Sequence, residues 1–284
     1  NMMSGVHGID MGCLVIAADD GIMPQTIEHF NIFRLLDISK LIIVINKIDL
    51  VENDILEIIK LEIFDLLKDT KFENCPILNV STIDNEGITE LKKTFLNTIN
   101  YFSKKDNQGP FRLPIDRIFS IKGFGTVVTG TVISGEIKVG NELNIQPINK
   151  IVKIRGLNTH NSSTDKISIG QRAAINIQNI DKNKIKRGFQ IVDKNFFYGT
   201  KSVIAKIYLL DDAIKEIKKN QRIRIHLGTL EVIGKVFLFD KKIISSGQES
   251  IVLINFETPL VACYKDKFII RHYSPVFTLG GGEV

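Results

Sequence analysis

The chain has 284 residues, of which 44% are hydrophobic and 24% charged, so it is long enough for two or three domains with sizeable cores. This composition excludes a disordered tail, a collagen and a coiled-coil rod. The charge is unevenly divided, because residues 1–105 carry a net charge of −6 and residues 106–284 a net charge of +11. The basic part suits a polyanion such as a nucleic acid, although a solvated basic face explains the same numbers.

The sequence gives no support for a membrane protein or for a metal-dependent protein. No apolar run approaches the roughly 18 to 20 residues of a membrane helix, so we expect no membrane contact. The cysteines Cys13, Cys75 and Cys263 are odd in number and far apart, which indicates a reducing, cytoplasmic compartment. The five histidines are scattered without ligand spacing, so we expect no metal site.

Up to about residue 100, short apolar strands alternate with amphipathic helices. This rhythm predicts a parallel sheet with helical crossovers. We expect strands over residues 13–17, 41–45 and 77–80, and helices over residues 24–36, 52–68 and 88–99.

A polar stretch with two prolines follows, and after it the helical period disappears. Short β-branched strands with Gly and Asn between them indicate closed barrels or sandwiches. We therefore expect an α/β domain followed by two antiparallel β-barrels. The predicted boundaries are 1–105 for the α/β part, 106–114 for a linker, 115–195 for the first barrel and 196–284 for the second.

An N-K-x-D motif directly follows the apolar strand 41–45, with Asn46, Lys47 and Asp49 as its side chains. Open α/β sheets bind ligands at the carboxyl ends of their strands. The Asp49 carboxylate can accept hydrogen bonds from the N1 and N2 donors of guanine, a pair that adenine lacks. The stem of Lys47 can lie over the purine, and the Asn46 amide can tie neighbouring loops. The motif predicts a guanine-nucleotide site, with a plain strand-to-helix turn as the alternative.

A second loop supports the nucleotide interpretation. Ser81 follows the strand 77–80, and the loop from Ser81 to Gly87 can present a backbone N–H to the guanine O6. The carboxyl ends of neighbouring parallel strands meet at one edge of a sheet. We therefore expect Ser81 to belong to the same guanine site.

No G-x-x-x-x-G-K-[ST] phosphate loop occurs in the sequence, so we expect the groups that cradle phosphates and hold Mg²⁺ to lie outside it. The sequence begins at Asn1 without an initiating Met, and we expect a piece of a longer protein. We expect no catalytic residue in this chain and no GTP hydrolysis by it alone.

Several stretches carry a family resemblance. Residues 1–30, the N-K-I-D motif and the Ser81 loop resemble the G domain of translational GTPases of the elongation factor Tu class. Within that class, the stretches IDRIFSIKGFGTVVTGT (115–131), GQRAAINI (170–177) and PVFTLGGGEV (275–284) resemble the bacterial selenocysteine-specific elongation factors. The resemblance implies a partial P-loop GTPase domain followed by barrels like domains 2 and 3 of elongation factor Tu. The family's phosphate loop, switch regions and C-terminal winged-helix domains have no counterpart in the sequence.

The resemblance also implies an aminoacyl pocket on the first barrel, formed by Asp116, Arg117 and Arg172. A selenol is a stronger acid than a thiol, whose reference pKa is about 8.5, so selenocysteine is anionic at neutral pH. Two guanidinium groups favour such an anion, and Asp116 would orient them. The alternative is a surface ion pair beside a solvated arginine.

The function that the resemblance implies is GTP-dependent delivery of selenocysteinyl-tRNA to the ribosome. GTP and Mg²⁺ would be its cofactors, and the selenocysteine insertion element of the messenger would be bound only through the winged-helix domains. Two alternatives remain open at this stage. One is another GTPase of the same class that binds ordinary aminoacyl- or initiator-tRNA, or that serves a sulfate adenylyltransferase. The other is a non-enzymatic, RNA-binding double barrel.

Overall fold

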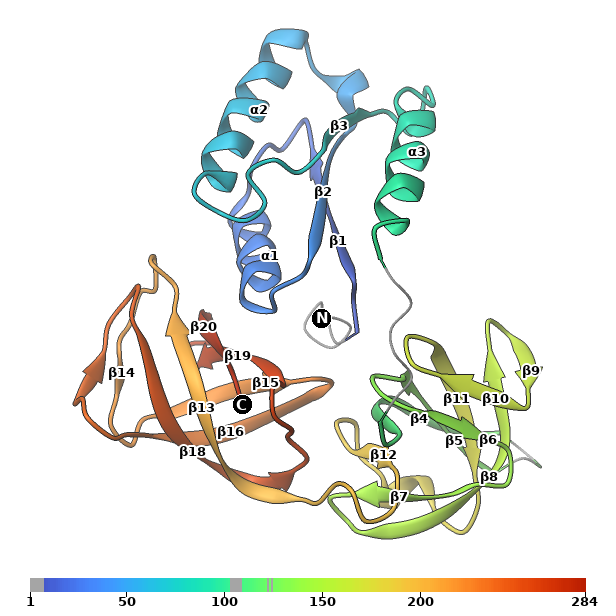
Figure 1. The fold of residues 1–284 in the computed structure, drawn as a ribbon. Helices are drawn as coiled ribbons and strands as arrows, with labels where there is room; N and C mark the ends of the chain where they lie inside the picture. The colour runs from blue at the N-terminus through green and yellow to red at the C-terminus, as the bar shows by residue number, and fades with distance from the viewer. Residues whose placement is uncertain (1–7, 103–108, 122, 124) are drawn as a thin grey trace. The chain divides into compact units, whose positions relative to one another are not determined.

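The computed structural model describes residues 8–102, 109–121, 123 and 125–284, and it contains two compact units (Figure 1). One unit spans residues 9–104 and is an α/β structure, and the other contains two β-barrels. The predicted fold class, an α/β unit followed by two antiparallel barrels, is confirmed. Within the described residues, no helix has the length and apolar character needed to cross a membrane.

The α/β unit contains a parallel sheet in the order β1-β2-β3. The central strand, β2, is buried on both faces, as its continuous apolar run predicts. Helices α1 and α2 cover one face and α3 covers the other (Figure 1). The elements are β1 (Met11–Ala17), α1 (Pro24–Leu35), β2 (Lys40–Asn46), the 3₁₀ turn η2 (Ile48–Leu50), α2 (Asn53–Leu67), β3 (Ile77–Val80) and α3 (Ile88–Ile99).

The first barrel closes through six strands, in the order β11-β5-β4-β12-β7-β8, because β8 pairs back onto β11. Its interior is filled by fully buried aliphatic residues such as Leu113, Val128 and Ile175. Its elements are β4 (Arg112–Ile121), β5 (Gly125–Thr131), β6 (Glu136–Lys138), β7 (Glu142–Gln146), β8 (Lys150–Thr159), β9 (Ser162–Thr164), β10 (Lys166–Ser168), β11 (Arg172–Ile177), η3 (Lys182–Lys184) and β12 (Gln190–Val192).

The second barrel is also closed by six strands, in the order β13-β18-β16-β15-β19-β20. Its last strand is rich in glycine for a steric reason: a Cβ on Gly280 would lie 2.0 Å from the backbone oxygen of Tyr208. The elements are β13 (Thr200–Leu209), β14 (Ile217–Lys218), β15 (Arg222–Leu227), β16 (Leu230–Leu238), β17 (Ile243–Ile244), β18 (Glu249–Leu260), β19 (Lys267–His272) and β20 (Thr278–Glu283).

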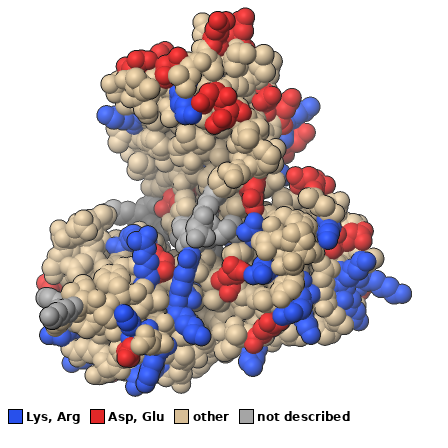
Figure 2. All heavy atoms as spheres, turned by 180° about the vertical axis from the view of Figure 1, so that it is seen from behind, with Lys and Arg blue, Asp and Glu red and all other residues tan. Residues whose placement is uncertain are grey.

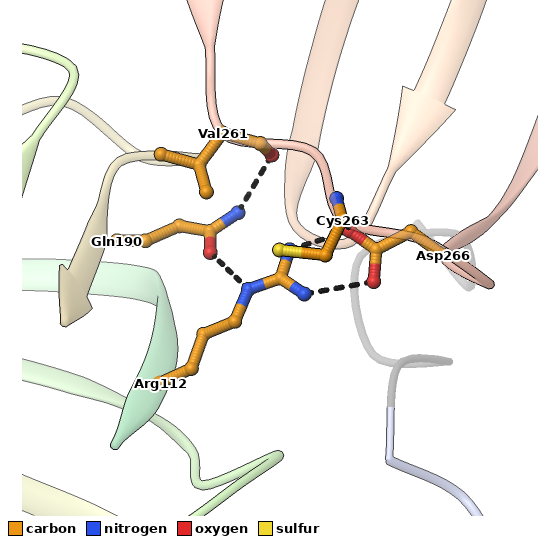
Figure 3. A network of polar contacts seen from close by, with 5 residues as sticks. All are labelled: Arg112, Gln190, Val261, Cys263 and Asp266. Carbon is orange, nitrogen blue, oxygen red and sulfur yellow. Dashed lines mark hydrogen bonds and ion pairs between the residues drawn. The ribbon is translucent and has the colours of Figure 1, made fainter. Parts of the chain in front are cut away.

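A buried polar network joins the two barrels (Figure 3). Arg112 at the start of β4 donates from Nη1 and Nη2 to the two carboxylate oxygens of Asp266, at 2.8 and 2.6 Å. Its Nε donates to Gln190 Oε1 at 2.6 Å, and Gln190 Nε2 in turn donates to the Val261 carbonyl at 3.2 Å. The side chains of Arg112 and Asp266 are only 8% and 13% exposed. The ion pair is therefore shielded from water.

Strand β4 extends into the segment 106–114, which the sequence predicts to be a linker. Strand β4 begins at Arg112, and Phe111 is fully buried. Pro114 explains the difference, because a proline argues against a strand when only the sequence is read. In the barrel, Pro114 lies opposite Gln190, and the ladder continues through the next donor, the Ile115 N–H, which binds the Phe189 carbonyl. Residues 106–108 of the predicted linker lie outside the described residues, and the domain boundaries stay predictions.

We expect the stability of the second barrel to fall as the pH drops below about 6.5, the ordinary histidine value, because of His226. Burial lowers the pKa of this imidazole, and the nearby Arg271, Arg224 and Arg187 lower it further, against the opposing effect of Glu231. At pH values between the lowered pKa of the folded state and the ordinary histidine value, the unfolded chain binds a proton more readily than the folded chain does. Acid therefore favours unfolding. Urea unfolding can be measured at about pH 7.5 and about pH 5.5, on either side of the ordinary histidine pKa. Between these two pH values, the free energy of unfolding should fall less in His226→Phe than in wild type. Equal losses would contradict this role.

Candidate functional site

The N-K-x-D side chains lie at the carboxyl edge of the sheet. Asn46 is the last residue of β2, and its carbonyl accepts a hydrogen bond from the Ala18 N–H at 2.8 Å, which ties the ends of β1 and β2 together. Its side-chain Oδ1 is buried and has no hydrogen-bond partner among the described residues. Asp49 lies in the short turn η2, where it is exposed and finds no ion-pair partner in the described part of the chain. A buried acceptor and an exposed carboxylate at this edge fit a ligand that donates hydrogen bonds.

Lys47 is held across the same edge by Asp19, a residue that the sequence analysis did not single out. Lys47 adopts a left-handed conformation, with φ of 62°. Its Nζ donates to both carboxylate oxygens of Asp19, at 2.9 and 2.7 Å. This hydrogen bond lowers the pKa of Asp19 and raises that of Lys47. Asp19 follows β1 at the same sheet edge, and that position was the available signal for it.

The loop after β3 has a tight internal structure that depends on Ser81 and Gly87. Ser81 is fully buried, its N–H donates to the Glu86 carbonyl at 3.1 Å, and its Oγ accepts from the Asp84 N–H at 3.2 Å. The N–H of Ser81 is therefore already bonded, and a donor to a base would come from another residue of the loop. Gly87 has φ of 70°, and a Cβ there would lie 2.0 Å from the Asn79 carbonyl oxygen. Ser81 thus shapes the loop.

A β-bulge in β4 brings Asp116 and Arg117 to the same side of the first barrel. Opposite β5, Ile115 pairs with Gly130 and Arg117 with Thr129, so Asp116 is the extra residue. Ile115 and Ile118 both pack in the barrel core. The two residues between them consequently face outward together, which strict alternation along a strand does not allow.

Asp116 and Arg172 are in direct contact on this outer face. Arg172 Nη1 donates to Asp116 Oδ2 at 2.5 Å, and Thr129 Oγ1 donates to Asp116 Oδ1 at 2.5 Å. The Asp116 side chain is 16% exposed and that of Arg172 is 55% exposed, so part of the guanidinium faces solvent. Three neighbouring strands, β4, β5 and β11, each contribute one of these residues.

Arg117 lies beside this pair on β4 but is not bonded to it. It is exposed and forms no hydrogen bond or ion pair with any described residue. Thr129, which holds the second oxygen of Asp116, was missed by the sequence analysis because a hydroxyl at an unremarkable strand position gives no signal. Among the described residues of this outer face, the Arg117 guanidinium is free and that of Arg172 is half-engaged.

No group of three or more His, Cys, Asp or Glu side chains suited to a metal ion occurs within the described residues. At the sheet edge, Asn46, Lys47 and Asp49 offer a buried acceptor, an ammonium group held by Asp19 and an exposed carboxylate. On the outer face of the first barrel, Arg117 and Arg172 offer two guanidinium groups beside Asp116.

Three family models match the chain in succession. Residues 1–101 match the elongation factor Tu GTP binding domain, residues 125–192 match elongation factor Tu domain 2, and residues 200–284 match the beta-barrel domain of the selenocysteine-specific elongation factor. The chain therefore resembles the selenocysteine-specific elongation factors along its whole length. This assignment confirms the resemblance inferred from the sequence motifs.

Individual relatives agree with this family. The selenocysteine-specific elongation factor of Desulfomicrobium baculatum is 35% identical over 100% of the chain and 45% of its own length. A crystal structure of a bacterial selenocysteine-specific elongation factor, EF-Sec, matches with a TM-score of 0.88 at 28% identity, over 100% of this chain and 46% of its own. The Methanococcus maripaludis factor SelB, solved with the GTP analogue GPPNHP, has a TM-score of 0.85 at 28% identity, over 97% and 65%. The chain thus spans less than half the length of the curated bacterial relative and of the bacterial structure.

Proposed function

We propose that this chain supplies the base-reading part of the GTP site and the aminoacyl-binding barrel of a GTP-dependent carrier of selenocysteinyl-tRNA to the ribosome. The observation that carries the proposal is the outer face of the first barrel, where Asp116 holds Arg172 and the bulge places Arg117 beside them. Two guanidinium groups around one partly buried carboxylate leave a net positive charge that suits a selenolate. The sequence motifs at the sheet edge fit the guanine of GTP.

The proposed selectivity for a selenocysteinyl over a seryl group follows from charge. A selenolate carries a full negative charge, whereas the hydroxyl of a seryl group is neutral and gains little from a guanidinium. Asp116 keeps Arg172 in place and lowers the net charge of the site, so that phosphate and other anions are bound less well. GTP with Mg²⁺, which the family implies, would supply the switch between tRNA binding and release, and the contribution of this chain is to recognise the base.

Arg172→Ala is expected to lower the affinity for selenocysteinyl-tRNA roughly ten- to a hundredfold, the equivalent of losing one hydrogen bond to a charged group. Binding of seryl-tRNA should change little, because its hydroxyl is neutral. Both affinities can be measured with a full-length protein that contains this chain and is loaded with GTP. Arg172→Lys, which keeps the charge without the planar fork, should recover part of the loss.

Arg155→Ala is the matched control, since Arg155 is an exposed arginine on β8 of the same barrel. A general phosphate-contacting arginine would weaken both tRNAs alike and reduce the salt dependence of both. If Arg172→Ala behaves in that way, the aminoacyl pocket is wrongly assigned.

Asp49→Asn is expected to weaken GTP binding ten- to a hundredfold and to improve binding of the xanthine nucleotide, because the change replaces an acceptor with a donor opposite the base edge. The measurement is nucleotide affinity in the same full-length protein. Asp65→Asn, at an exposed position of α2, serves as the control. An unaltered preference for guanine would remove Asp49 from base recognition.

A further inference from the structure

Two pairs of adjacent lysines lie side by side on the second barrel. Strand β14 pairs with β17, so that Ile217 faces Ile244 and Lys218 faces Ile243. One residue further along, the Lys219 N–H donates to the Lys242 carbonyl at 3.2 Å. The ladder thus joins the Lys218–Lys219 pair to the Lys241–Lys242 pair.

These lysines line an open pocket of about 590 Å³. Asp240 is the one carboxylate among the lining residues, so four ammonium groups face a single negative charge. None of the four lysines forms an ion pair with a carboxylate of the described residues. In Figure 2, Lys and Arg side chains gather at the right-hand edge, which corresponds to the side where Figure 1 shows β14. The pocket therefore has a strong excess of positive charge.

The backbone under the pocket is firmly anchored. Ile217 and Ile244 are fully buried in the core of the barrel. The turn after β14 is closed by two further hydrogen bonds, from the Lys218 N–H to Gln221 Oε1 at 2.8 Å and from the Asn220 N–H to the Val236 carbonyl at 2.7 Å. Like charges held close together repel one another, and a bound anion relieves that repulsion. The pocket is thus pre-organised for an anion.

Phe239 gives the pocket a second kind of contact. Its side chain lies among the lysines and is 57% exposed, with Ile243 beside it at 39%. An exposed aromatic ring within a basic groove is the arrangement on which unpaired bases stack, while the cations contact the phosphates. An acidic peptide would use the lysines but would have no need of the ring face.

We propose that this pocket, formed by Lys218, Lys219, Phe239, Lys241 and Lys242, binds a segment of single-stranded nucleic acid. The lysines contact successive phosphates, and one base stacks on Phe239. The inference goes beyond the proposed function and does not rest on it, because the pocket belongs to the second barrel and shares no residue with the Asp116–Arg172 face of the first. It assigns this end of the second barrel a role in holding an unpaired strand.

The test uses this chain and two fluorescein-labelled oligonucleotides, one of uridine (RNA) and one of deoxyuridine (DNA). Binding is followed by fluorescence anisotropy at several salt concentrations. Lys241→Ala/Lys242→Ala should weaken binding and reduce the slope of log affinity against log salt by about 1.4, or about 0.7 for each phosphate that is no longer neutralised by a lysine. Phe239→Leu keeps apolar bulk without the ring face. It should weaken binding by roughly fivefold or more with an unchanged salt slope.

The matched control is Lys92→Ala/Lys93→Ala, which removes an equally exposed pair of adjacent lysines from α3. A 4-thiouridine oligonucleotide gives an independent localisation, because irradiation should cross-link it to the peptide that contains Phe239. Equal effects of the two lysine pairs, or no effect of Phe239→Leu, would overturn the proposal. Binding of poly-glutamate with the same affinity as the oligonucleotides and the same dependence on Lys241 and Lys242 would also overturn it, and would indicate an acidic protein instead. If RNA alone binds, or RNA and DNA both do, the proposal stands, and the comparison identifies the natural strand.

Discussion

Arg112→Ala is expected to lower the free energy of unfolding of the two-barrel unit by about 3 to 5 kcal/mol, the usual cost of removing one partner of a buried ion pair. The change leaves the Asp266 carboxylate with the Cys263 N–H, at 2.8 Å, but without the two guanidinium donors that now neutralise it. It also leaves Gln190 Oε1 without its donor. Urea unfolding followed by circular dichroism measures the loss.

Arg222→Ala provides the comparison. Arg222 also forms an ion pair, with Glu257, but both side chains are more than 40% exposed, and such surface pairs contribute far less to stability than a buried pair. The double change Arg112→Met/Asp266→Leu should recover most of the lost stability, because an apolar pair of similar size removes the uncompensated charge. If Arg112→Ala costs no more than Arg222→Ala, the network does not hold the barrels together.

Gly87→Ala is expected to destabilise the α/β unit by roughly 2 to 4 kcal/mol, the sum of left-handed backbone strain and a forced rearrangement of packed atoms. The added Cβ would lie 2.0 Å from the Asn79 carbonyl oxygen, and backbone can give way only if β3 or the loop moves. Since this loop borders the predicted guanine site, GTP affinity of a full-length protein should fall as well. Thermal unfolding and nucleotide titration test the two effects separately.

Gly21→Ala measures the cost of backbone strain at a positive φ without a steric clash. Gly21 has φ of 67°, close to that of Gly87, but the nearest atom to an added Cβ is 3.9 Å away, at the end of the Glu62 side chain. This variant should therefore lose only about 1 kcal/mol, the cost of the backbone conformation alone. Comparable losses in the two variants would show that the backbone around Asn79 relaxes freely.

Much of the fold could be predicted because its signals are local. The strand 77–80 and the helix 88–99 follow directly from apolar periodicity, and the structure has them at the same residues. Strand β20 lacks such a signal, because the glycines that allow it to approach the backbone of β13 have no side chains from which a period can be read. The two-residue strands β14 and β17 are also too short to show a pattern.

The residues of the candidate sites also differ in whether the sequence alone can group them. Asn46, Lys47 and Asp49 lie within four consecutive residues, so a motif was enough to group them. Asp19 binds Lys47 from 28 residues away, and that partnership depends on the order of strands in the sheet. Arg172 lies 56 residues from Asp116, and only the family resemblance joined them before the structure placed them in contact.

The bulge in β4 determines which insertions and deletions this surface can accept. Along a regular strand, deleting one residue exchanges the inner and outer side chains of everything beyond it. Deleting Asp116 would instead leave Ile115, Arg117 and Ile118 paired with the residues of β5 that they already face, and the core would keep its aliphatic side chains. A single codon can therefore add or remove the carboxylate beneath Arg172 without rebuilding the barrel.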